Sequence, residues 1–369
     1  MVKKIANIEE YIHDNYRNVT ELMGTILGNV SVGINKNSNE KHVLKLCNKY
    51  RSHTRLESAE MEIKIMEELC NNKSNNFLVN LICVIQDNAK YLIILEYVNG
   101  GDLLDLIQNN FPKGLPIQTI KKWGKQLLKG LQLMHDNGYC HLDISCENIL
   151  YDKNTDSIKI CDFGLARKMI PNEAFPVERG QKRGKPGYMA IEILEYQSYY
   201  GYSADVFSLG VVFWIMFTGL PPFEQANKVA VRYFGNPKGL SAIIQSWKQR
   251  NGTRHVTRIP SDCLNWLAKM FTTKYNRISI NELLKCDFFN DVELDDEKSD
   301  KIDDDKKPTK NVNNNDNNIP NGNENRDDSK SISMSRDESK HENSVHSEES
   351  NTINISSSSS QTINTRDML

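Results

Sequence analysis

Residues 140–150 read "CHLDISCENIL", in which a His, an Asp and an Asn stand at fixed spacing between two apolar ends. Asp143 lies five positions before Asn148. A second short motif, "DFG" at 162–164, follows the apolar segment "SIKIC" and begins 14 positions after Asn148. Two carboxylates and an amide on neighbouring loops supply the oxygen ligands that Mg²⁺ prefers when it bridges phosphates. Asp143, Asn148 and Asp162 are therefore a candidate metal and phosphate site.

Lys45 and Glu62 form a candidate ion pair upstream of these loops. Lys45 stands in the apolar strand "KHVLKLC", and Glu62 lies on a helix predicted by Met61, Ile65 and Leu69, which recur every four residues. A lysine buried in a cleft wall needs a counter-charge, which Glu62 can supply, and Lys45 could then hold phosphate oxygens. A single Lys or Asp is more often a solvated surface group, so the ordered combination is what points to a site.

Hydrophobic patterning divides the chain into a small β-rich part and a larger helical part. Residues 20–98 read as strands interrupted by one helix, because segments such as "NVSVGIN" and "KHVLKLC" alternate around polar turns. Residues 102–290 are mostly helical, and "EYVNGGD" connects the two parts. One face of a long predicted helix carries Ile120, Trp123, Leu127, Leu131 and Met134. We expect an α+β fold of two lobes, with ligands bound between them.

Composition excludes several classes of protein. The 369 residues carry a net charge of −2, so no global attraction to nucleic acid or to a membrane is expected. The eight cysteines are scattered without a CxxC pair, which is typical of reduced thiols in an intracellular protein. The N-terminus has charges where a signal peptide needs an apolar core, and Val2 excludes N-myristoylation. The most apolar run, 206–217, is shorter than the about 20 residues that span a bilayer and predicts a buried helix.

The C-terminal part, residues 291–369, consists mainly of Asn, Asp, Ser, Glu and Lys. It has too few apolar side chains to offset the entropy lost on ordering, so we expect a disordered tail. A solvated tail is the simpler interpretation, and a docking or phosphoregulated tail is the alternative.

The chain from about Thr20 to Asn290 resembles a eukaryotic protein kinase. The motifs that carry the resemblance are, in chain order, "HVLKLC", "HLDISCENIL", "CDFGLA", "GKPGYMAIE", "SADVFSLGVVFWIMFTGLPPF" and "NRISINELLKCDFF". The resemblance implies a leader (1–19), a β-rich N-lobe (20–98), a mainly α-helical C-lobe (99–290) and the tail (291–369).

The resemblance also implies roles for single residues. Lys45 would contact the α/β-phosphates of ATP and pair with Glu62, and Asp143 would orient the substrate hydroxyl and accept its proton. Asn148 and Asp162 would hold Mg²⁺, with Mn²⁺ as an alternative. The residues implied around the nucleotide are Gly28 in the glycine-rich loop, Leu95 as gatekeeper, the Glu96 carbonyl and Val98 backbone at the hinge, and Val30, Val43 and Leu150 against adenine. For these apolar residues a plain core role is an open alternative.

Two departures concern nucleotide binding and regulation. Met23 and Thr25 replace the first two glycines of the glycine-rich loop, which predicts a stiffer lid over the phosphates. In kinases that keep it, the Arg at the position of Leu142 binds a phosphate on the activation segment. The corresponding segment here, residues 162–192, contains no Ser and no Thr. We therefore hypothesise that activity does not require Ser/Thr phosphorylation of this segment.

Two further departures concern residues 141–150, which the resemblance identifies as the catalytic loop. Ser145 replaces the Lys that normally touches the transferring phosphate, whereas Lys185 stands where the family has Thr. We hypothesise that Lys185 supplies, from a different position, the positive charge that the missing loop Lys would provide. The alternative is that Lys185 is simply part of a basic segment. Cys146 replaces a Pro and is expected to be a packed thiol rather than a modified one. Glu192 is expected to pair with Arg277 although Ile191 replaces the Pro before it.

The leading interpretation is an ATP-dependent protein kinase acting on Ser/Thr hydroxyls, and the alternative is a catalytically inactive scaffold. Substrate cues conflict, since Asp102 and Glu147 would favour basic residues and the basic segment 167–185 would favour acidic ones. The leader is expected to form a helix on the small lobe or to fray. We further expect protein substrates, a monomer and a cytoplasmic or nuclear location. We expect no nucleic-acid or membrane partner, and we expect the tail to bind regulatory proteins.

Overall fold

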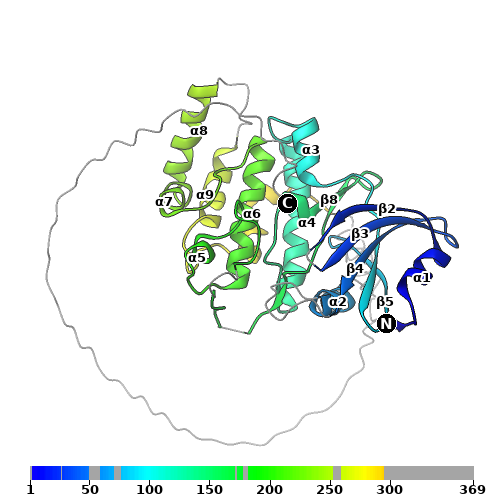
Figure 1. Cartoon of the computed structure of the whole chain (residues 1–369). Helices are drawn as coiled ribbons and strands as arrows, with labels where there is room; N and C mark the ends of the chain where they lie inside the picture. The colour runs from blue at the N-terminus through cyan, green and yellow to red at the C-terminus, as the bar shows by residue number, and fades with distance from the viewer. Residues whose placement is uncertain are drawn as a thin grey trace, which may run out of the picture. The chain divides into compact units, whose positions relative to one another are not determined.

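The computed structural model describes residues 2–25, 27–49, 59–69, 76–170, 173–177, 182–251 and 259–294. A six-stranded sheet forms the N-terminal lobe and helices form most of the rest (Figure 1), which confirms the predicted α+β class. The strand order is β1-β5-β6-β4-β3-β2. The strands are β1 (Val2–Lys4), β2 (Tyr16–Gly24), β3 (Gly28–Asn35), β4 (Lys41–Asn48), β5 (Leu81–Gln86) and β6 (Lys90–Glu96).

Strand β4 lies inside the sheet, between β3 and β6, and its alternation gives the sheet two different faces. Leu44 packs in a small cluster on one face, whereas Cys47 belongs to the main core on the other. The register pairs Lys45 with Val30 on one side and with Ile93 on the other. Lys45 is thereby fixed in the middle of a paired strand rather than on a loop.

The first residues of the chain are part of this lobe, which differs from the predicted leader at 1–19. Strand β1 pairs in parallel with β5, and β2 already begins at Tyr16. Helix α1 (Ile8–Asn15) joins them, and the Asn7 side chain caps it by accepting from the Glu9 N–H at 2.9 Å. Helix α1 lies against the sheet (Figure 1), where Ile8 packs with Leu44 and Leu92. The helical alternative for the leader is thus confirmed, and the pairing of β1 is a long-range contact that local pattern could not reveal.

Helix α2 (Ala59–Leu69) confirms the helix expected from the repeat of apolar residues every four positions. Ile65 and Leu69 are buried, and Met61 packs at the edge of the core. Glu62 is buried as well, at 1% exposure, although it is a carboxylate on a half-exposed helix. A buried carboxylate requires a partner, and for Glu62 this partner is the Lys45 ammonium.

The described part of the C-terminal lobe is helical apart from two short antiparallel strand pairs. Its strands are β7 (Tyr139–Cys140), β8 (Ile149–Asp152), β9 (Ser157–Ile160) and β10 (Arg167–Lys168). Its helices are α3 (Leu103–Asn110), α4 (Ile117–Asp136), α5 (Ile191–Leu194), α6 (Gly201–Thr218), α7 (Lys228–Phe234), α8 (Pro237–Asn251), α9 (Ser261–Met270) and α10 (Ile280–Leu283), with single 3₁₀ turns at Cys146–Asn148 and Asp287–Phe289.

Helices α4 and α6 form the centre of this lobe. All five apolar residues predicted for one face of α4 are buried. Helix α6 is buried on every side, as expected for the run 206–217. By length and composition α6 could cross a membrane, and it is the one described helix that passes this test, but 89% of that window is buried inside the fold. Its apolar character is therefore accounted for by the core.

The folded chain extends past the predicted boundary at residue 290. The ammonium of Lys121 on α4 lies 2.6 Å from the Asp291 carboxylate, and Lys125 donates to the Val292 carbonyl at 2.6 Å. Leu294 is 5% exposed. These residues belong to the polar stretch by composition, yet side chains of α4 hold them. The rest of the predicted disordered tail, residues 295–369, lies outside the described residues.

Candidate active site

Lys45 joins the two lobes at the candidate site. Its ammonium lies 2.8 Å from Glu62 Oε1 on α2 and 2.9 Å from Asp162 Oδ1, which follows β9. The Lys45 side chain is 11% exposed, that of Glu62 1% and that of Asp162 49%. Three residues, of which Lys45 and Asp162 are 117 positions apart, thus form one charged group, and the carboxylate of Asp162 is the member that reaches solvent.

The electrostatics keep this group ionised. Burial by itself would lower the pKa of Lys45, but the carboxylates of Asp162 and Glu62 outweigh it and raise that pKa well above its usual value. The charge of Lys45 lowers the pKa of Asp162 to about 2, against the opposing effect of burial. An anionic Asp162 facing solvent beside a permanent cation is suited to bind a metal–phosphate group.

The catalytic loop is held by a residue that sequence reasoning missed, Asp205 on α6. Its carboxylate accepts the backbone N–H of His141 at 2.8 Å and of Leu142 at 2.7 Å, and it is 1% exposed. Leu142 has φ of 64°, a left-handed conformation that is rare for a residue with a Cβ. The two charge-assisted hydrogen bonds offset this strain. The sequence feature that could have revealed this role is that Asp205 is the single acidic residue of an otherwise largely apolar helix.

His141 is fully buried and packs beneath the loop, as expected. Burial lowers the pKa of its imidazole, which favours the neutral ring. Nδ1 accepts the Asp143 N–H at 3.2 Å, so Nε2 carries the proton and donates to the Cys161 carbonyl at 3.1 Å. This tautomer ties the loop to the strand that precedes Asp162.

Asp143 and Asn148 are in direct contact. The Asn148 amide donates to the carbonyl and to Oδ2 of Asp143, both at 2.8 Å. The other carboxylate oxygen of Asp143, Oδ1, is buried and has no hydrogen-bond partner among the described residues. Burial raises the pKa of Asp143 to about 7, while the charge of Lys185 acts in the opposite direction. Such a carboxyl exchanges its proton near neutral pH and has one oxygen free to receive it.

The oxygen ligands fit Mg²⁺ bound together with a phosphate ligand. Among the described residues, no group of three or more His, Cys, Asp or Glu could hold a metal ion without other ligands. Asp162 presents a half-exposed carboxylate, and Asn148 uses its amide nitrogen on Asp143, which leaves its amide oxygen as an acceptor. Mg²⁺ characteristically takes one or two protein oxygens and completes its shell with water and substrate phosphates.

Ser145 and Lys185, which replace a Lys and a Thr of the family pattern, are in contact. The Lys185 ammonium donates to Ser145 Oγ at 3.0 Å and lies 3.5 Å from Glu147 Oε1. The Ser145 residue is fully buried, whereas the Lys185 side chain is 36% exposed. The neighbouring basic residue, Lys182, instead places its ammonium 4.1 Å from the centre of the Tyr196 ring. Lys185 is therefore distinguished from Lys182 by its contact with the catalytic loop.

Cys146 and the ion pair of Glu192 also behave as expected. Cys146 is fully buried and burial raises the pKa of its thiol, which makes it a packed and unreactive residue. Arg277 reaches both carboxylate oxygens of Glu192, at 2.8 and 3.2 Å, in a buried bidentate pair. The cysteines in the described ranges are all free thiols.

The turn after β2 has its own hydrogen bonds. Thr25 donates its N–H to the Gly28 carbonyl at 2.7 Å, and its Oγ1 accepts the Gly28 N–H at 3.0 Å. A Cβ on Gly28 would lie 1.9 Å from the Leu46 carbonyl oxygen, whereas a Cβ on Gly24 would meet nothing within 4 Å. Gly28 is thus required because β3 and β4 lie too close together for a Cβ at this position. The Thr25 side chain also occupies the Gly28 N–H, which a phosphate could otherwise accept from.

Leu95, Glu96 and Val98 lie where the lobes connect, at and just after the end of β6, whereas Val30, Val43 and Leu150 lie on β3, β4 and β8. Leu95 is 9% exposed, Val98 is 8% exposed, and Leu95 pairs in register with Val43 across β4 and β6. The Glu96 side chain accepts from the Asn80 N–H at 2.7 Å and from the Lys159 ammonium at 2.6 Å. A salt bridge between the lobe connection and β9 therefore stabilises this region.

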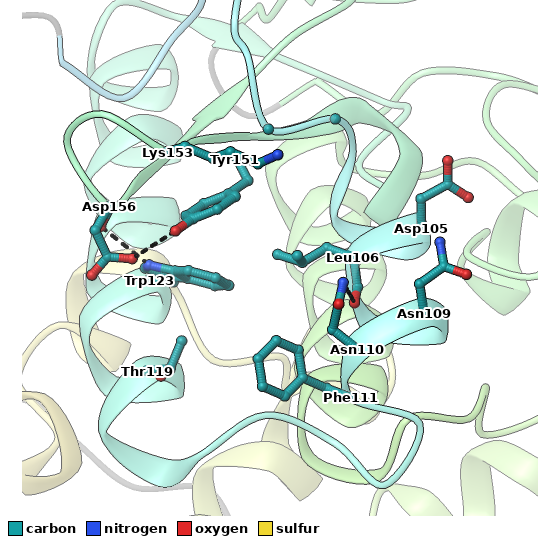
Figure 2. A pocket seen from close by; sticks show the side chains of 12 residues that line it. Asp105, Leu106, Asn109, Asn110, Phe111, Thr119, Trp123, Tyr151, Lys153 and Asp156 are labelled. Carbon is teal, nitrogen blue, oxygen red and sulfur yellow. Dashed lines mark hydrogen bonds between the residues drawn. The ribbon is translucent and has the colours of Figure 1, made fainter.

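A cavity of about 560 Å³ lies elsewhere, between α3, α4 and β8, and Figure 2 shows the side chains around it. Trp123 donates its indole N–H to the Asp156 carbonyl at 3.3 Å, and the Trp123 and Tyr151 rings are 5.0 Å apart. None of the residues assigned to the nucleotide or to catalysis lines this cavity. It is not the candidate active site.

Comparison with known proteins identifies the family. Residues 20–289 match the family described as "Protein kinase domain". The chain is similar to "Probable serine/threonine-protein kinase 2" of Plasmodium falciparum, at 27% identity over 64% of this chain and 50% of the relative. It is similar to "Maternal embryonic leucine zipper kinase" of Danio rerio, at 31% identity over 58% of this chain and 31% of the relative. It is also similar to "Mitogen-activated protein kinase kinase kinase ANP1" of Arabidopsis thaliana, at 30% identity over 71% of this chain and 38% of the relative.

The chain spans half or less of the length of these three relatives. The family match, in contrast, covers nearly the whole of the folded chain, and the start and end expected from the motifs, Thr20 and Asn290, agree with it to within one residue. The resemblance found in the sequence is therefore confirmed, and the chain belongs to the protein kinase family.

Proposed function

We propose that this chain is an active protein kinase that uses ATP and Mg²⁺ to phosphorylate Ser and Thr hydroxyls of protein substrates. The observation that carries the proposal is the position of Lys45, which lies within 3 Å of both Glu62 and Asp162. A lysine so placed has its charge secured and stands beside the carboxylate that would bind the metal. Phosphoryl transfer asks the protein chiefly for positioning and charge stabilisation, which this arrangement supplies.

In the proposed mechanism Asp143 orients the acceptor hydroxyl and takes its proton on Oδ1, the oxygen that has no partner among the described residues. Asn148 holds the other oxygen and so fixes the direction of the carboxylate. Lys45 would bind the α- and β-phosphates, and Asn148 and Asp162 would hold Mg²⁺. When bound, Mg²⁺ neutralises charge on the phosphates. Leu95, Glu96 and Val98 would line the adenine site, with Val30, Val43 and Leu150 on its two sides and Gly28 at the lid.

The test is transfer of radiolabel from ATP to a generic protein substrate, comparing the wild type with Asp143→Ala. The proposal predicts labelled substrate with the wild type and none above background with the variant. Phosphoamino-acid analysis of the product then separates Ser and Thr from Tyr as acceptors. Equal labelling by the two proteins would contradict the proposed base.

An inactive scaffold is the second candidate, and the Thr25–Gly28 turn favours it. The Gly28 N–H is already bonded to Thr25 Oγ1, so one backbone donor of the loop is withdrawn from phosphate. If the chain is an inactive scaffold, the wild type should transfer no label and Thr25→Gly should not restore transfer. If the chain is an active kinase, Thr25→Gly should tighten ATP binding but should not be needed for activity.

We further propose that Lys185 supplies the cation that the catalytic loop lacks. Its ammonium contacts Ser145 at 3.0 Å and lies close enough to influence Asp143. At an effective dielectric constant near 20, a cation about 4 Å from a phosphate is worth a few kcal/mol. The ammonium in this proposal points past Ser145 toward the γ-phosphate.

Lys185→Ala should therefore lower kcat by about a hundredfold, whereas the matched variant Lys182→Ala should change it little because Lys182 packs on Tyr196. Since the charge of Lys185 lowers the pKa of Asp143, the rise of kcat/KM with pH should move to higher pH in Lys185→Ala. A Ser145→Lys/Lys185→Thr double variant should recover more activity than either single variant. Equal, small effects of both alanine variants would rule the proposal out.

Activity independent of segment phosphorylation is proposed from the contacts of residues 183–185. Arg183 is 5% exposed and donates to the Leu165 carbonyl at 3.1 Å. Gly184 has φ of 97°, and a Cβ there would lie 2.8 Å from the Leu142 carbonyl oxygen. The Lys185–Ser145 hydrogen bond and the close approach of Gly184 to Leu142 bind the segment to the catalytic loop, and Arg183 ties the end of the segment to its beginning, all without a modified side chain.

Phosphatase treatment should accordingly leave the activity of the purified protein unchanged within about twofold. Mass spectrometry of the treated protein checks that phosphate has been removed. Loss of activity on treatment, with recovery on rephosphorylation at a residue between Asp162 and Glu192, would overturn the proposal. Arg183→Lys should retain more activity than Arg183→Gln if the charge–carbonyl contact positions the segment.

From the sequence we also propose a monomer in the cytoplasm or nucleus, whose tail binds regulatory proteins.

A further inference from the structure

Helix α2 carries Glu62, so the position of this helix decides whether Lys45 keeps its partner. Glu62 lies in the first turn of α2, and Ile65 and Leu69, further along the helix, are buried in the main core. Apolar packing is non-directional, so it restricts the rotation and tilt of a helix less sharply than hydrogen bonds and ion pairs do. The ion pair with Lys45, at 2.8 Å, is such a directional contact, and it comes from the N-terminal lobe.

A second directional contact holds the last turn of α2, and it comes from the C-terminal lobe. The Tyr139 hydroxyl on β7 donates to Glu68 Oε2 at 2.6 Å. Tyr139 is fully buried, and burial together with the Glu68 carboxylate raises the pKa of Tyr139 to about 12. The phenol therefore keeps its proton near neutral pH and remains a donor. Glu68 Oε1 lies 3.9 Å from Lys64 on the same helix, where both side chains are about half exposed.

Tyr139 is itself fixed by the elements around the catalytic loop. Strand β7 pairs with β10, which places Tyr139 opposite Lys168. The Lys168 ammonium lies 5.6 Å from the centre of the Tyr139 ring. Two residues after Tyr139, the backbone N–H of His141 is held by Asp205 at 2.8 Å. The hydroxyl that contacts α2 therefore belongs to a part of the C-terminal lobe that also positions the catalytic loop.

We propose that Tyr139 is a positioning residue that holds α2 through Glu68. With the helix so held, Glu62 stays paired with Lys45. The inference rests on the proposed kinase function and adds a residue that acts on ATP only through the helix. A hydrogen bond to a charged group shifts an equilibrium between two helix positions by about ten- to hundredfold. Because ATP would bind the position in which Lys45 is paired, its apparent affinity falls with the fraction of protein in that position.

The experiment compares the wild-type full chain with Tyr139→Phe, which removes only the hydroxyl. The KM for ATP in phosphorylation of a generic protein substrate should rise about tenfold. Bound ATP favours the paired position, so kcat at saturating ATP should change by less than about twofold. The dissociation constant of MgATP from isothermal titration calorimetry should rise with the KM. A role in stability alone would instead lower kcat through loss of folded protein and leave the KM for ATP unchanged.

Hydrogen exchange supplies a measurement that needs no nucleotide. In the ATP-free protein, opening of the last turn of α2 must break the hydrogen bond between Tyr139 and Glu68. The amides of residues 59–69, followed by mass spectrometry, should therefore exchange about tenfold faster in Tyr139→Phe than in the wild type.

Changes at Glu68 test whether the two side chains act as a pair. Glu68→Gln keeps an acceptor oxygen and should retain more affinity for ATP than Glu68→Leu, which should match Tyr139→Phe. The double variant Tyr139→Phe/Glu68→Leu should bind ATP no more weakly than either single variant. The matched control is Tyr151→Phe, which removes a hydrogen bond of 3.3 Å from a tyrosine hydroxyl to the Asp156 carboxylate. Its KM for ATP should stay within about twofold of the wild-type value.

The outcomes separate this inference from the proposed function. Weaker MgATP binding and faster exchange in Tyr139→Phe, without phosphate transfer by the wild type, support the positioning role and contradict catalysis. Phosphate transfer by the wild type with an unchanged KM for ATP in Tyr139→Phe overturns the positioning role alone. Equal effects of Tyr139→Phe and Tyr151→Phe also overturn it. Absence of transfer by the wild type together with unchanged exchange in Tyr139→Phe overturns both proposals.

Discussion

Replacing Asp143 with Asn is expected to lower kcat by about 10²- to 10⁴-fold, the usual contribution of a positioned acid–base group. The amide has nearly the same shape as the carboxyl and can still accept from Asn148, so the loop should stay in place. What it loses is the ability to take a proton on Oδ1. The matched control is Asp14→Asn, since Asp14 is 64% exposed on α1 and far along the chain from the loop.

The pH dependence gives an independent measurement of the same residue. Burial raises the pKa of Asp143 to about 7, so the free protein carries a protonated, inactive base below that pH. The kcat/KM should therefore rise as the pH increases through about 7 and then level off. Asp143→Asn should show no such rise in its residual activity. A wild-type profile that is flat between pH 6 and 8 would contradict Asp143 as the base.

Replacing Arg277 with Met is expected to lower the free energy of unfolding by ~3–5 kcal/mol, because Glu192 would be left buried and unpaired. Glu192 is 3% exposed, and Arg277 also donates to the Ser203 carbonyl at 2.7 Å and to the Thr272 carbonyl at 2.9 Å. Its loss therefore breaks the contact between α5 and the segment before α10. Urea unfolding followed by circular dichroism measures the change.

Two further variants show whether the pair is the cause. Arg277→Met/Glu192→Met should be more stable than Arg277→Met alone, because it removes the stranded charge. Lys122→Met breaks an ion pair with Asp156 in which the side chains are 38% and 59% exposed, and should cost no more than about 1 kcal/mol. Similar destabilisation by Lys122→Met and Arg277→Met would show that burial of the pair is not what matters.

Local patterns predicted the elements that position the site. Alternation predicted the strand that carries Lys45, helical periodicity predicted the apolar face of α4, and a continuous apolar run predicted the burial of α6. These predictions depend on near neighbours along the chain, which determine whether a segment forms an amphipathic helix or a half-buried strand. The match of Ser145 with Lys185 also came from the sequence, through two departures from one family pattern.

Other features depended on contacts between distant segments. The parallel pairing of β1 with β5 has no local sign, since three residues are too few to show a period. The boundary at residue 290 followed composition, but Lys121 and Lys125 of α4 hold the next residues in place. The role of Asp205 could not be derived from its own segment, because its partners are two backbone N–H groups of the catalytic loop and the His135 ring on α4.

The sequence by itself determined the family, the two-lobed α+β class and the residues of the candidate site, because the types and spacing of these residues are local properties of the chain. Only the tertiary structure decided which partners those residues have. It joined Lys45 to both Glu62 and Asp162, left Asp143 Oδ1 buried and free among the described residues, and occupied Glu147 with Lys185. Charge, burial and hydrogen bonding of a side chain depend on partners brought from distant segments, and folding alone places those partners.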